Sequence, residues 1–209
     1  HIQIPHVVLN CVEGPCKPSD VRSRAGDVKI ALYQGRYAPG RGLENLIRAS
    51  EYIEDDVVLL MRGFGELEAR LKKLAEGRDN CRFVDPVPMD QLAAKAAEAH
   101  VGIIPYLPMN LGYYLASPNK LFEYIQAGIP IAASDLPFLR KIILEEDIGL
   151  TFDPFDPKDM ADAINKITRE SMLMRLRQNV RKAAEKYDWR REEEKLLEVY
   201  ETAMADRHC

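Results

Sequence analysis

Short apolar runs alternate with amphipathic stretches along most of the chain from residue 28 onward. The apolar runs have the length of buried strands, and the stretches between them repeat apolar positions at helical spacing, as do Leu67, Leu71 and Leu74. The expected strands are residues 28–34, 56–63, 81–85, 101–106, 129–134 and 148–152. The expected helices are residues 42–53, 65–77, 89–100, 118–128, 137–147, 156–168, 170–187 and 189–204.

The expected strands are apolar on both faces, which is typical of parallel strands that helices cover on both sides. Since crossover connections between parallel strands are right-handed, the alternation predicts an α/β fold with a Rossmann-like doubly wound parallel sheet. Extra C-terminal helices follow the last strand. Residues 1–27 lack the alternation and are rich in turn-forming residues, so we expect a linker there and one domain over residues 28–209.

The composition is that of an ordinary globular protein, since 46% of the 209 residues are hydrophobic and 30% are charged. The net charge of -4 argues against a nucleic-acid partner, which usually requires a basic excess. No apolar run approaches the ~20 residues of a membrane span, and no signal peptide is visible, so we expect a cytoplasmic protein. Because the sequence opens at His1 rather than at methionine, we expect it to be a piece of a longer chain.

The cysteines do not have the spacing of a metal site. Cys11 and Cys16 lie close together, but neither Cys81 nor Cys209 is followed by the paired cysteine or histidine that a zinc site requires. We therefore predict no bound metal, and free reduced thiols.

The first expected strand leads into a loop that contains two arginines. Gly35, Arg36 and Arg41 lie in "QGRYAPGRG", just before the helix expected from Gly42. A helix N-terminus presents unpaired backbone N–H groups, and two guanidinium groups beside it suit a diphosphate. The alternative is that both arginines are solvated on a surface loop. The motif is neither a Walker A loop nor a GxGxxG fingerprint.

A second candidate is "SPNKLFEYIQAG", which starts at Ser117 where a long loop ends. Lys120 and Glu123 share one face at the start of the expected helix, so they form either a weak surface pair or part of a ligand site at the carboxyl ends of the strands. Glu123 lies between apolar positions, where a pair of ribose hydroxyls would satisfy its carboxylate. Long loops in compact domains are usually functional, which favours a ligand.

Several stretches, taken in order, resemble the group 1 glycosyltransferases of the GT-B fold, which include the family 4-like enzymes. "QGRYAPGRGLENLIRAS", "LLMRGFGELEARLKKLA" and "CRFVDPVPMDQLAAKAAEAHVGIIPY" resemble the family's motifs over its first strands. "PNKLFEYIQAGIPIAASDLP" is similar to its helix-to-strand motif, and "AAEKYDWRREEEKLLEVYETA" is similar to its closing helix. The resemblance runs from about residue 28 to the end of the sequence.

The resemblance implies one half of a two-domain enzyme. In this family two Rossmann-like domains face each other across a cleft, the C-terminal one holding the nucleotide-sugar donor and the N-terminal one, absent here, holding the acceptor. Residues 1–27 would then be the interdomain linker, and residues 28–209 the donor-binding domain. When the family's roles are carried over by position, Arg36 and Arg41 would bind the donor diphosphate and Glu123 would bind the ribose hydroxyls. The backbone near Val84 would contact the base. The phosphate and sugar would be bound by Gly35, Ser117, Asn119 and Lys120.

The chain also departs from the family pattern. The family usually has lysine where Arg41 stands, which keeps the charge and changes its geometry. Many members carry a second glutamate at the position of Leu115, so the sugar contact of that carboxylate is in doubt. A subgroup with "SPxK" in this loop lacks the glutamate too, with a lysine such as Lys120 as a replacement. Asp85 stands where glycine is usual.

By resemblance, the function is transfer of a sugar from a nucleotide-diphosphate sugar to an acceptor, without a metal or other cofactor. Arg36 and Arg41 would stabilise the departing diphosphate. The acceptor, a sugar or a lipid-linked molecule, would be bound by the missing N-terminal domain, so we expect this chain alone to bind donor without transferring sugar. Family habit suggests polysaccharide or glycoconjugate synthesis, with peripheral association of the whole protein with the inner face of a membrane.

The C-terminal helix suggests a further contact. In the family this helix crosses back to the N-terminal domain, so part of the apolar face of Leu197, Tyr200 and Met204 is expected to be exposed, and a dimer could form through it.

Two other functions remain open at this point. One is a non-catalytic nucleotide-sugar-binding or scaffold module, which Leu115 in place of a glutamate keeps open. The other is a nucleotide-sugar epimerase on the same fold, which would require acid and base side chains clustered in the cleft. His100 and the N-terminal histidines give no sign of such a cluster.

Overall fold

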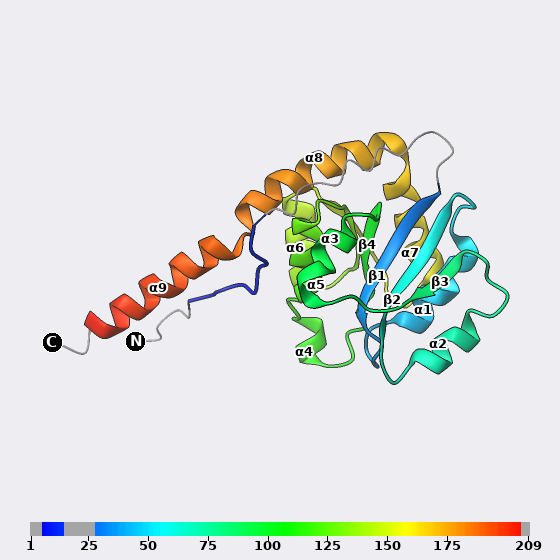
Figure 1. Ribbon diagram of the computed structural model, residues 1–209, viewed down its shortest axis with the longest axis horizontal. Coiled ribbons are helices and arrows are strands. Elements are labelled where there is room, and N and C mark those ends of the chain that lie inside the picture. Colours follow the sequence, from blue (N-terminus) through cyan, green and yellow to red (C-terminus); the bar gives the residue numbers. More distant parts are fainter. Residues whose placement is uncertain (1–5, 15–27, 206–209) are drawn as a thin grey trace.

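The structure is a computed structural model that describes residues 6–14 and 28–205. Within these stretches, six parallel strands form one sheet in the order β3-β2-β1-β4-β5-β6 (Figure 1). The strands are β1 (Lys29–Arg36), β2 (Val57–Phe64), β3 (Cys81–Val84), β4 (Val101–Ile104), β5 (Ile131–Ser134) and β6 (Gly149–Phe152). The strand order reverses between β1 and β4, which confirms the predicted doubly wound α/β fold.

Helices cover both faces of the sheet (Figure 1). One face packs against α1 (Leu43–Ala49), α2 (Glu68–Leu74) and α7 (Pro157–Thr168). The other face packs against α3 (Leu92–Ala96), α5 (Asn119–Gln126), α6 (Pro137–Glu145) and α8 (Glu170–Lys186). The remaining helical segments are α4 (Leu111–Tyr114), α9 (Trp189–Ala205) and the 3-10 turns Ser50–Tyr52 and Met89–Gln91.

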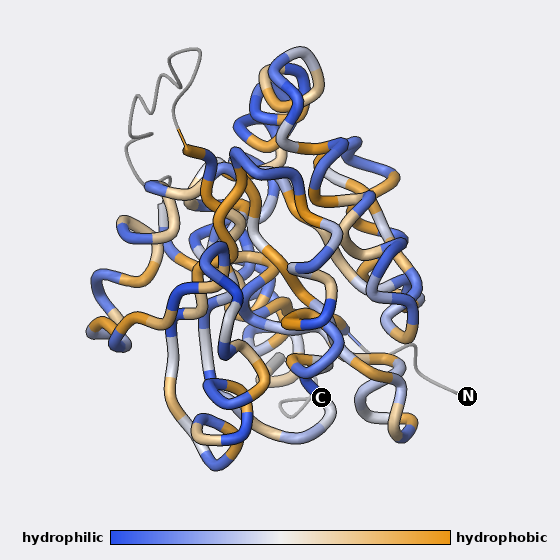
Figure 2. The backbone as a smooth tube through the Cα atoms, turned by 90° about the vertical axis from the view of Figure 1, so that its right-hand side faces the viewer, coloured by the Kyte–Doolittle hydropathy of each residue, from blue (hydrophilic) through white to orange (hydrophobic). Residues whose placement is uncertain are grey.

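The strands are apolar throughout because both of their faces are buried. On β1, Ala31 and Tyr33 pack in the cluster with α1, α2 and α7, whereas Leu32 between them packs in the cluster with α3, α5 and α6. This alternation follows from the two-residue period of a strand. Figure 2 shows the result, with hydrophobic segments concentrated in the centre and mixed colouring on the outer helices.

Some elements differ from their predicted bounds. The helix expected over 65–77 begins only at Glu68, because Gly65 has a φ of 147° and packs so closely on the backbone of Tyr37 that a Cβ would lie 2.4 Å from its oxygen. The strand expected over 101–106 ends at Ile104, where Pro105 removes the next N–H donor. Helix α4 was not predicted; it lies inside the long loop and is capped by the side chain of Asn110.

The described N-terminal segment, residues 6–14, lies against the C-terminal helices (Figure 1). The Leu9 N–H donates to Glu192 on α9 at 2.9 Å, and the Trp189 N–H donates to the Val12 carbonyl at 3.2 Å. The rest of the predicted linker, residues 1–5 and 15–27, lies outside the described residues. Over the part of the chain that the structure covers, no helix has the length and apolar character of a membrane span.

Candidate functional site

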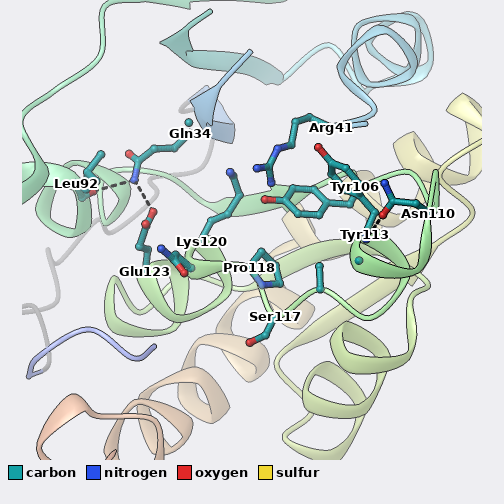
Figure 3. Close-up of a pocket in the computed structure, with 14 residues that line it drawn as sticks. Gln34, Arg41, Leu92, Tyr106, Asn110, Tyr113, Ser117, Pro118, Lys120 and Glu123 are labelled. Carbon is teal, nitrogen blue, oxygen red and sulfur yellow. Dashed lines mark hydrogen bonds between the residues drawn. The ribbon is translucent and has the colours of Figure 1, made fainter. Parts of the chain in front are cut away.

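A cavity of about 550 Å³ opens at the carboxyl edge of the sheet (Figure 3). It lies near the neighbouring strands β1 and β4, between which the strand order reverses. Open parallel sheets bind their ligands at such a point, and the volume is in the range of small-molecule sites. Its walls come from the end of β1, the loop before α1, the loop between β4 and α5, and the first turns of α5. The residues that the argument uses are Gln34, Gly35, Arg41, Tyr106, Tyr113, Ser117, Asn119, Lys120 and Glu123.

Lys120 is buried in the wall of this cavity, with 8% of its surface exposed. Its Nζ lies 5.0 Å from the ring centre of Tyr33 and 5.6 Å from that of Tyr106. The ammonium group lies next to Gly35, where a Cβ would be 2.8 Å from Nζ and where φ is 137°. The positive φ favours glycine at position 35, and a side chain there would displace the end of Lys120.

Among the residues that the structure describes, the charge of Lys120 has no carboxylate partner. The pKa of Lys120 is lowered to about 8, mainly by burial and in smaller part by the nearby Arg41, while Glu123 opposes both effects. In the described stretches of the chain, no ion pair links Lys120 to Glu123 or to another acidic residue. The interpretation of Lys120 and Glu123 as an exposed surface pair is therefore wrong, because the lysine is buried.

Arg41 reaches the same place from the loop before α1 (Figure 3). Its guanidinium carbon lies 4.3 Å from the ring centre of Tyr106 and 5.7 Å from that of Tyr113, so it stacks on aromatic faces. Its Nε is buried and has no hydrogen-bond partner within residues 6–14 and 28–205. Gly42 holds the loop in place, since it has a φ of 64° and a Cβ there would lie 1.8 Å from the Pro105 carbonyl oxygen.

Helix α4 supplies the aromatic wall behind Arg41. The Tyr113 hydroxyl donates to the Pro39 carbonyl at 3.0 Å, which ties α4 to the loop that carries Arg41. The rings of Tyr106 and Tyr113 meet edge to face, with their centres 5.9 Å apart. Leu115, at the end of α4, is exposed and is not part of the cavity wall.

Glu123 closes the opposite side of the cavity and is held by a neighbouring amide (Figure 3). Gln34 Nε2 donates to Glu123 Oε2 at 3.3 Å and to the Leu92 carbonyl at 3.4 Å. The carboxylate is half-buried, so its other oxygen is accessible to a ligand from the cavity.

The structure brings most of the predicted site residues together. Arg36 and Val84 do not line the cavity: Arg36 ends β1 beside Phe64, and Val84 ends β3 in register with Arg62. Both side chains are exposed further along the same carboxyl edge. The predicted residues that do line the cavity are Gly35, Arg41, Ser117, Asn119, Lys120 and Glu123.

The described residues contain no group of three or more histidine, cysteine, aspartate or glutamate side chains suited to hold a metal. Cys11 and Cys81 are free, and burial raises the pKa of Cys11 to about 12 and that of Cys81 to about 11, so both are thiols at neutral pH. Cys16 and Cys209 lie outside the described residues. His100 is buried, and its Nδ1 accepts the Ile30 N–H at 3.0 Å. The absence of a metal cofactor stays a prediction.

A comparison with protein families decides the class of the protein. The model of the family described as glycosyl transferases group 1 matches residues 19–187. The chain belongs to this family. It is 31% identical over 180 residues to the phosphatidyl-myo-inositol mannosyltransferase of Mycobacterium leprae, a match that covers 83% of this chain and 46% of the relative. The chain spans about half the length of the curated relatives it matches.

Solved structures show the fold of the group 1 glycosyl transferases in this chain. Sucrose-phosphate synthase from Thermosynechococcus elongatus matches with a TM-score of 0.69 at 24% identity, covering 87% of this chain and 47% of that one. The Anabaena protein HepE, in complex with UDP-glucose, matches with a TM-score of 0.71 at 15% identity, covering 85% of this chain and 50% of that one. The chain therefore has the Rossmann-like architecture of one half of a GT-B glycosyltransferase.

The wall residues that were not predicted include Gln34, Tyr106 and Tyr113, whose side chains hold the charged groups of the site. A signal for Gln34 is its position as the first polar residue at the end of an apolar strand. The two tyrosines lie in the long loop, which was predicted to be functional only because of its length. Nothing in the sequence predicted that their rings would hold the cations.

Proposed function

We propose that the chain is the donor-binding domain of a glycosyltransferase and binds a nucleotide-diphosphate sugar in this cavity. The observation that carries the proposal is the pair of cations, Arg41 and Lys120, which converge on Tyr106 without a carboxylate partner among the described residues. Two positive charges against a buried wall are costly when unpaired and are stabilised by an anion. A diphosphate supplies two or more negative charges at the required spacing.

The remaining residues of the site bind different parts of the donor. Ser117 and Asn119, at the start of α5, line the cavity, and no side chain caps the helix there. They add hydrogen bonds to the phosphate or sugar. Glu123 accepts hydrogen bonds from the ribose hydroxyls. Further along the edge, Arg36 contributes another positive charge for the diphosphate, and the backbone near Val84 contacts the base.

In the reaction, the bond between the sugar and the diphosphate breaks, and negative charge develops on the departing diphosphate. Arg41, Lys120 and Arg36 stabilise that charge in place of a divalent metal. The acceptor, a sugar or a lipid-linked molecule, is bound by a second domain in the whole protein. The relative from Mycobacterium leprae, a phosphatidyl-myo-inositol mannosyltransferase, supports an acceptor of this kind in glycoconjugate synthesis.

A binding titration tests the proposal. The 209-residue chain is titrated with UDP, GDP and ADP by ligand-observed NMR in the presence of EDTA, beside Lys120→Met and Glu123→Ala. We expect one nucleoside diphosphate to bind without metal, and each substitution to weaken binding about tenfold or more, because each removes a hydrogen bond to a charged group.

Lys72→Met is the matched control, since Lys72 is exposed on α2 and pairs with Glu68 away from the cavity. It should leave the affinity unchanged. The proposal is wrong if none of the three nucleotides binds, or if Lys120→Met binds as tightly as the Lys72→Met control.

A further inference from the structure

A buried arginine lies behind the candidate site. Arg62 belongs to the apolar strand β2, and only 7% of its surface is exposed. No carboxylate forms an ion pair with it in the described stretches. A buried charge is costly unless its donors are satisfied. The partner that the structure provides is an amide oxygen, since Arg62 NH1 donates to Gln34 Oε1 at 3.2 Å.

Gln34 connects this arginine to Glu123. Gln34 and Arg62 are register partners on β1 and β2, so their side chains lie on the same face of the sheet. Gln34 is 2% exposed, and its backbone N–H is fixed by a hydrogen bond of 3.1 Å to the Tyr124 hydroxyl. An arginine can only donate and an ionised carboxylate can only accept. The amide oxygen must therefore face Arg62, and the amide nitrogen must face Glu123.

The result is a directed chain of hydrogen bonds that runs from Arg62 through Gln34 to Glu123 (Figure 3 shows its last link). The positive guanidinium group polarises the amide and strengthens its donation to the carboxylate. Because Oε2 of Glu123 is occupied by Gln34, the carboxylate presents Oε1 to the cavity, and among the described residues no hydrogen bond involves that oxygen.

We propose that Gln34 and Arg62 are positioning residues that fix the carboxylate of Glu123 and thereby set the preference of the site for a ribose over a 2′-deoxyribose. The inference rests on the proposed function, because it takes Glu123 as the acceptor for the ribose hydroxyls. A fixed carboxylate meets both hydroxyls in one geometry, whereas a carboxylate that rotates freely gains less from the second hydroxyl.

The test compares ligands that differ by one hydroxyl. Wild type, Gln34→Leu and Arg62→Met are titrated with UDP, GDP and ADP, with their 2′-deoxy forms, and with inorganic pyrophosphate. In wild type the ribonucleotide should bind more tightly than its deoxy form, and each substitution should shrink that ratio about tenfold. Pyrophosphate affinity should stay unchanged, since Arg41 and Lys120 are not altered. In the double variant the ribose preference should fall by no more than in the more affected single variant, because both residues act through one contact.

Gln126→Leu is the matched control. Gln126 is an equally buried glutamine on α5, but its Nε2 donates to the Ala184 and Tyr187 carbonyls, away from the cavity. Its substitution should lower stability and leave the ribose preference intact. Gln34→Asn, which shortens the amide and withdraws it from Glu123, replaces Gln34→Leu if the latter does not fold.

The outcomes separate the two proposals. If Glu123→Ala abolishes the ribose preference while Gln34→Leu and Arg62→Met keep it, the positioning role is wrong and the donor site stands. If Gln34→Leu and Arg62→Met weaken the binding of pyrophosphate and of the nucleotide equally, the role of the two residues is only structural, and the inference is also wrong. If wild type binds no nucleoside diphosphate, the inference and the proposed function fall together.

Discussion

Two pairs of cations, one at each edge of the sheet, lie in different surroundings. At the amino edge, Lys29 pairs with Asp56 at 2.7 Å and Arg78 pairs with Glu51 at 3.4 Å, and these groups are partly or largely exposed. At the carboxyl edge, Arg41 and Lys120 lie on tyrosine rings and have no carboxylate partner in the described part of the chain.

This difference distinguishes surface charge from site charge. An exposed ion pair contributes about 0–1 kcal/mol and is already neutralised. A cation that rests on an aromatic face is partly stabilised by the ring but keeps its full charge. Arg41 and Lys120 at the carboxyl edge therefore retain charge for an anionic ligand, and the paired Lys29 and Arg78 at the amino edge do not.

The strongest test of this difference is the dependence of stability on pH at Lys120. The pKa of Lys120 is about 8 in the folded chain and 10.5 for an ordinary lysine, so between these values the unfolded chain binds the extra proton. The free energy of unfolding should therefore rise with pH across this window, by about 3 kcal/mol for this group. Lys120→Met lacks this rise. The free energy of unfolding of Lys120→Met minus that of wild type should therefore be lower at a pH of about 10.5 than at pH 7, by about 3 kcal/mol.

Urea unfolding of both proteins at several pH values gives this difference directly. The comparison with the variant is needed because Cys11 and Cys81, whose pKa values burial raises, contribute with the opposite sign in the same window. A difference that stays constant with pH would mean that Lys120 is not an unpaired buried cation.

A smaller effect is expected from the glycine that holds the Arg41 loop. Gly42→Ala and Gly77→Ala both place a side chain at a positive φ, of 64° and 77°. At Gly77, near the amino edge, a Cβ meets nothing within 4 Å, whereas at Gly42 it would lie 1.8 Å from the Pro105 oxygen. We expect Gly42→Ala to destabilise the chain by about 2 kcal/mol more than Gly77→Ala, measured by urea unfolding. Equal losses would show that the loop relaxes freely.

The smallest effect is expected at the amino edge itself. Arg78→Met removes one member of a partly exposed ion pair with Glu51. Its free energy of unfolding should change by no more than about 0.5 kcal/mol, and its affinity for the nucleotide found by titration should match that of wild type. A clear loss of affinity in Arg78→Met would contradict the assignment of the ligand site to the carboxyl edge.

The sequence predicted those parts of the molecule that depend on local pattern. The strands could be predicted because each is an apolar run between helices, and their common carboxyl edge is what brings Arg41, Lys120 and Glu123 near one another. Resemblance added which ligand group each residue would meet, and those roles stay predictions.

What the sequence did not predict depends on register and on loop conformation. The contact between Gln34 and Arg62 arises only when β1 and β2 pair with these residues opposite each other, and an apolar pattern fits several registers. Helix α4 is one turn held by the Asn110 cap and by the Tyr113 contact with Pro39. Such tertiary contacts leave no periodic signal in the sequence.

The stacking of Arg41 and Lys120 on tyrosines also has a consequence for the entropy of association. Long cationic side chains normally lose rotational freedom when they close on a ligand, at about 0.5–1.5 kcal/mol for each chain. Here the rings of Tyr33, Tyr106 and Tyr113 already hold the side chains of Arg41 and Lys120 in place before a ligand binds. The arriving anion meets a surface that is already arranged, so binding requires little rearrangement of these two side chains.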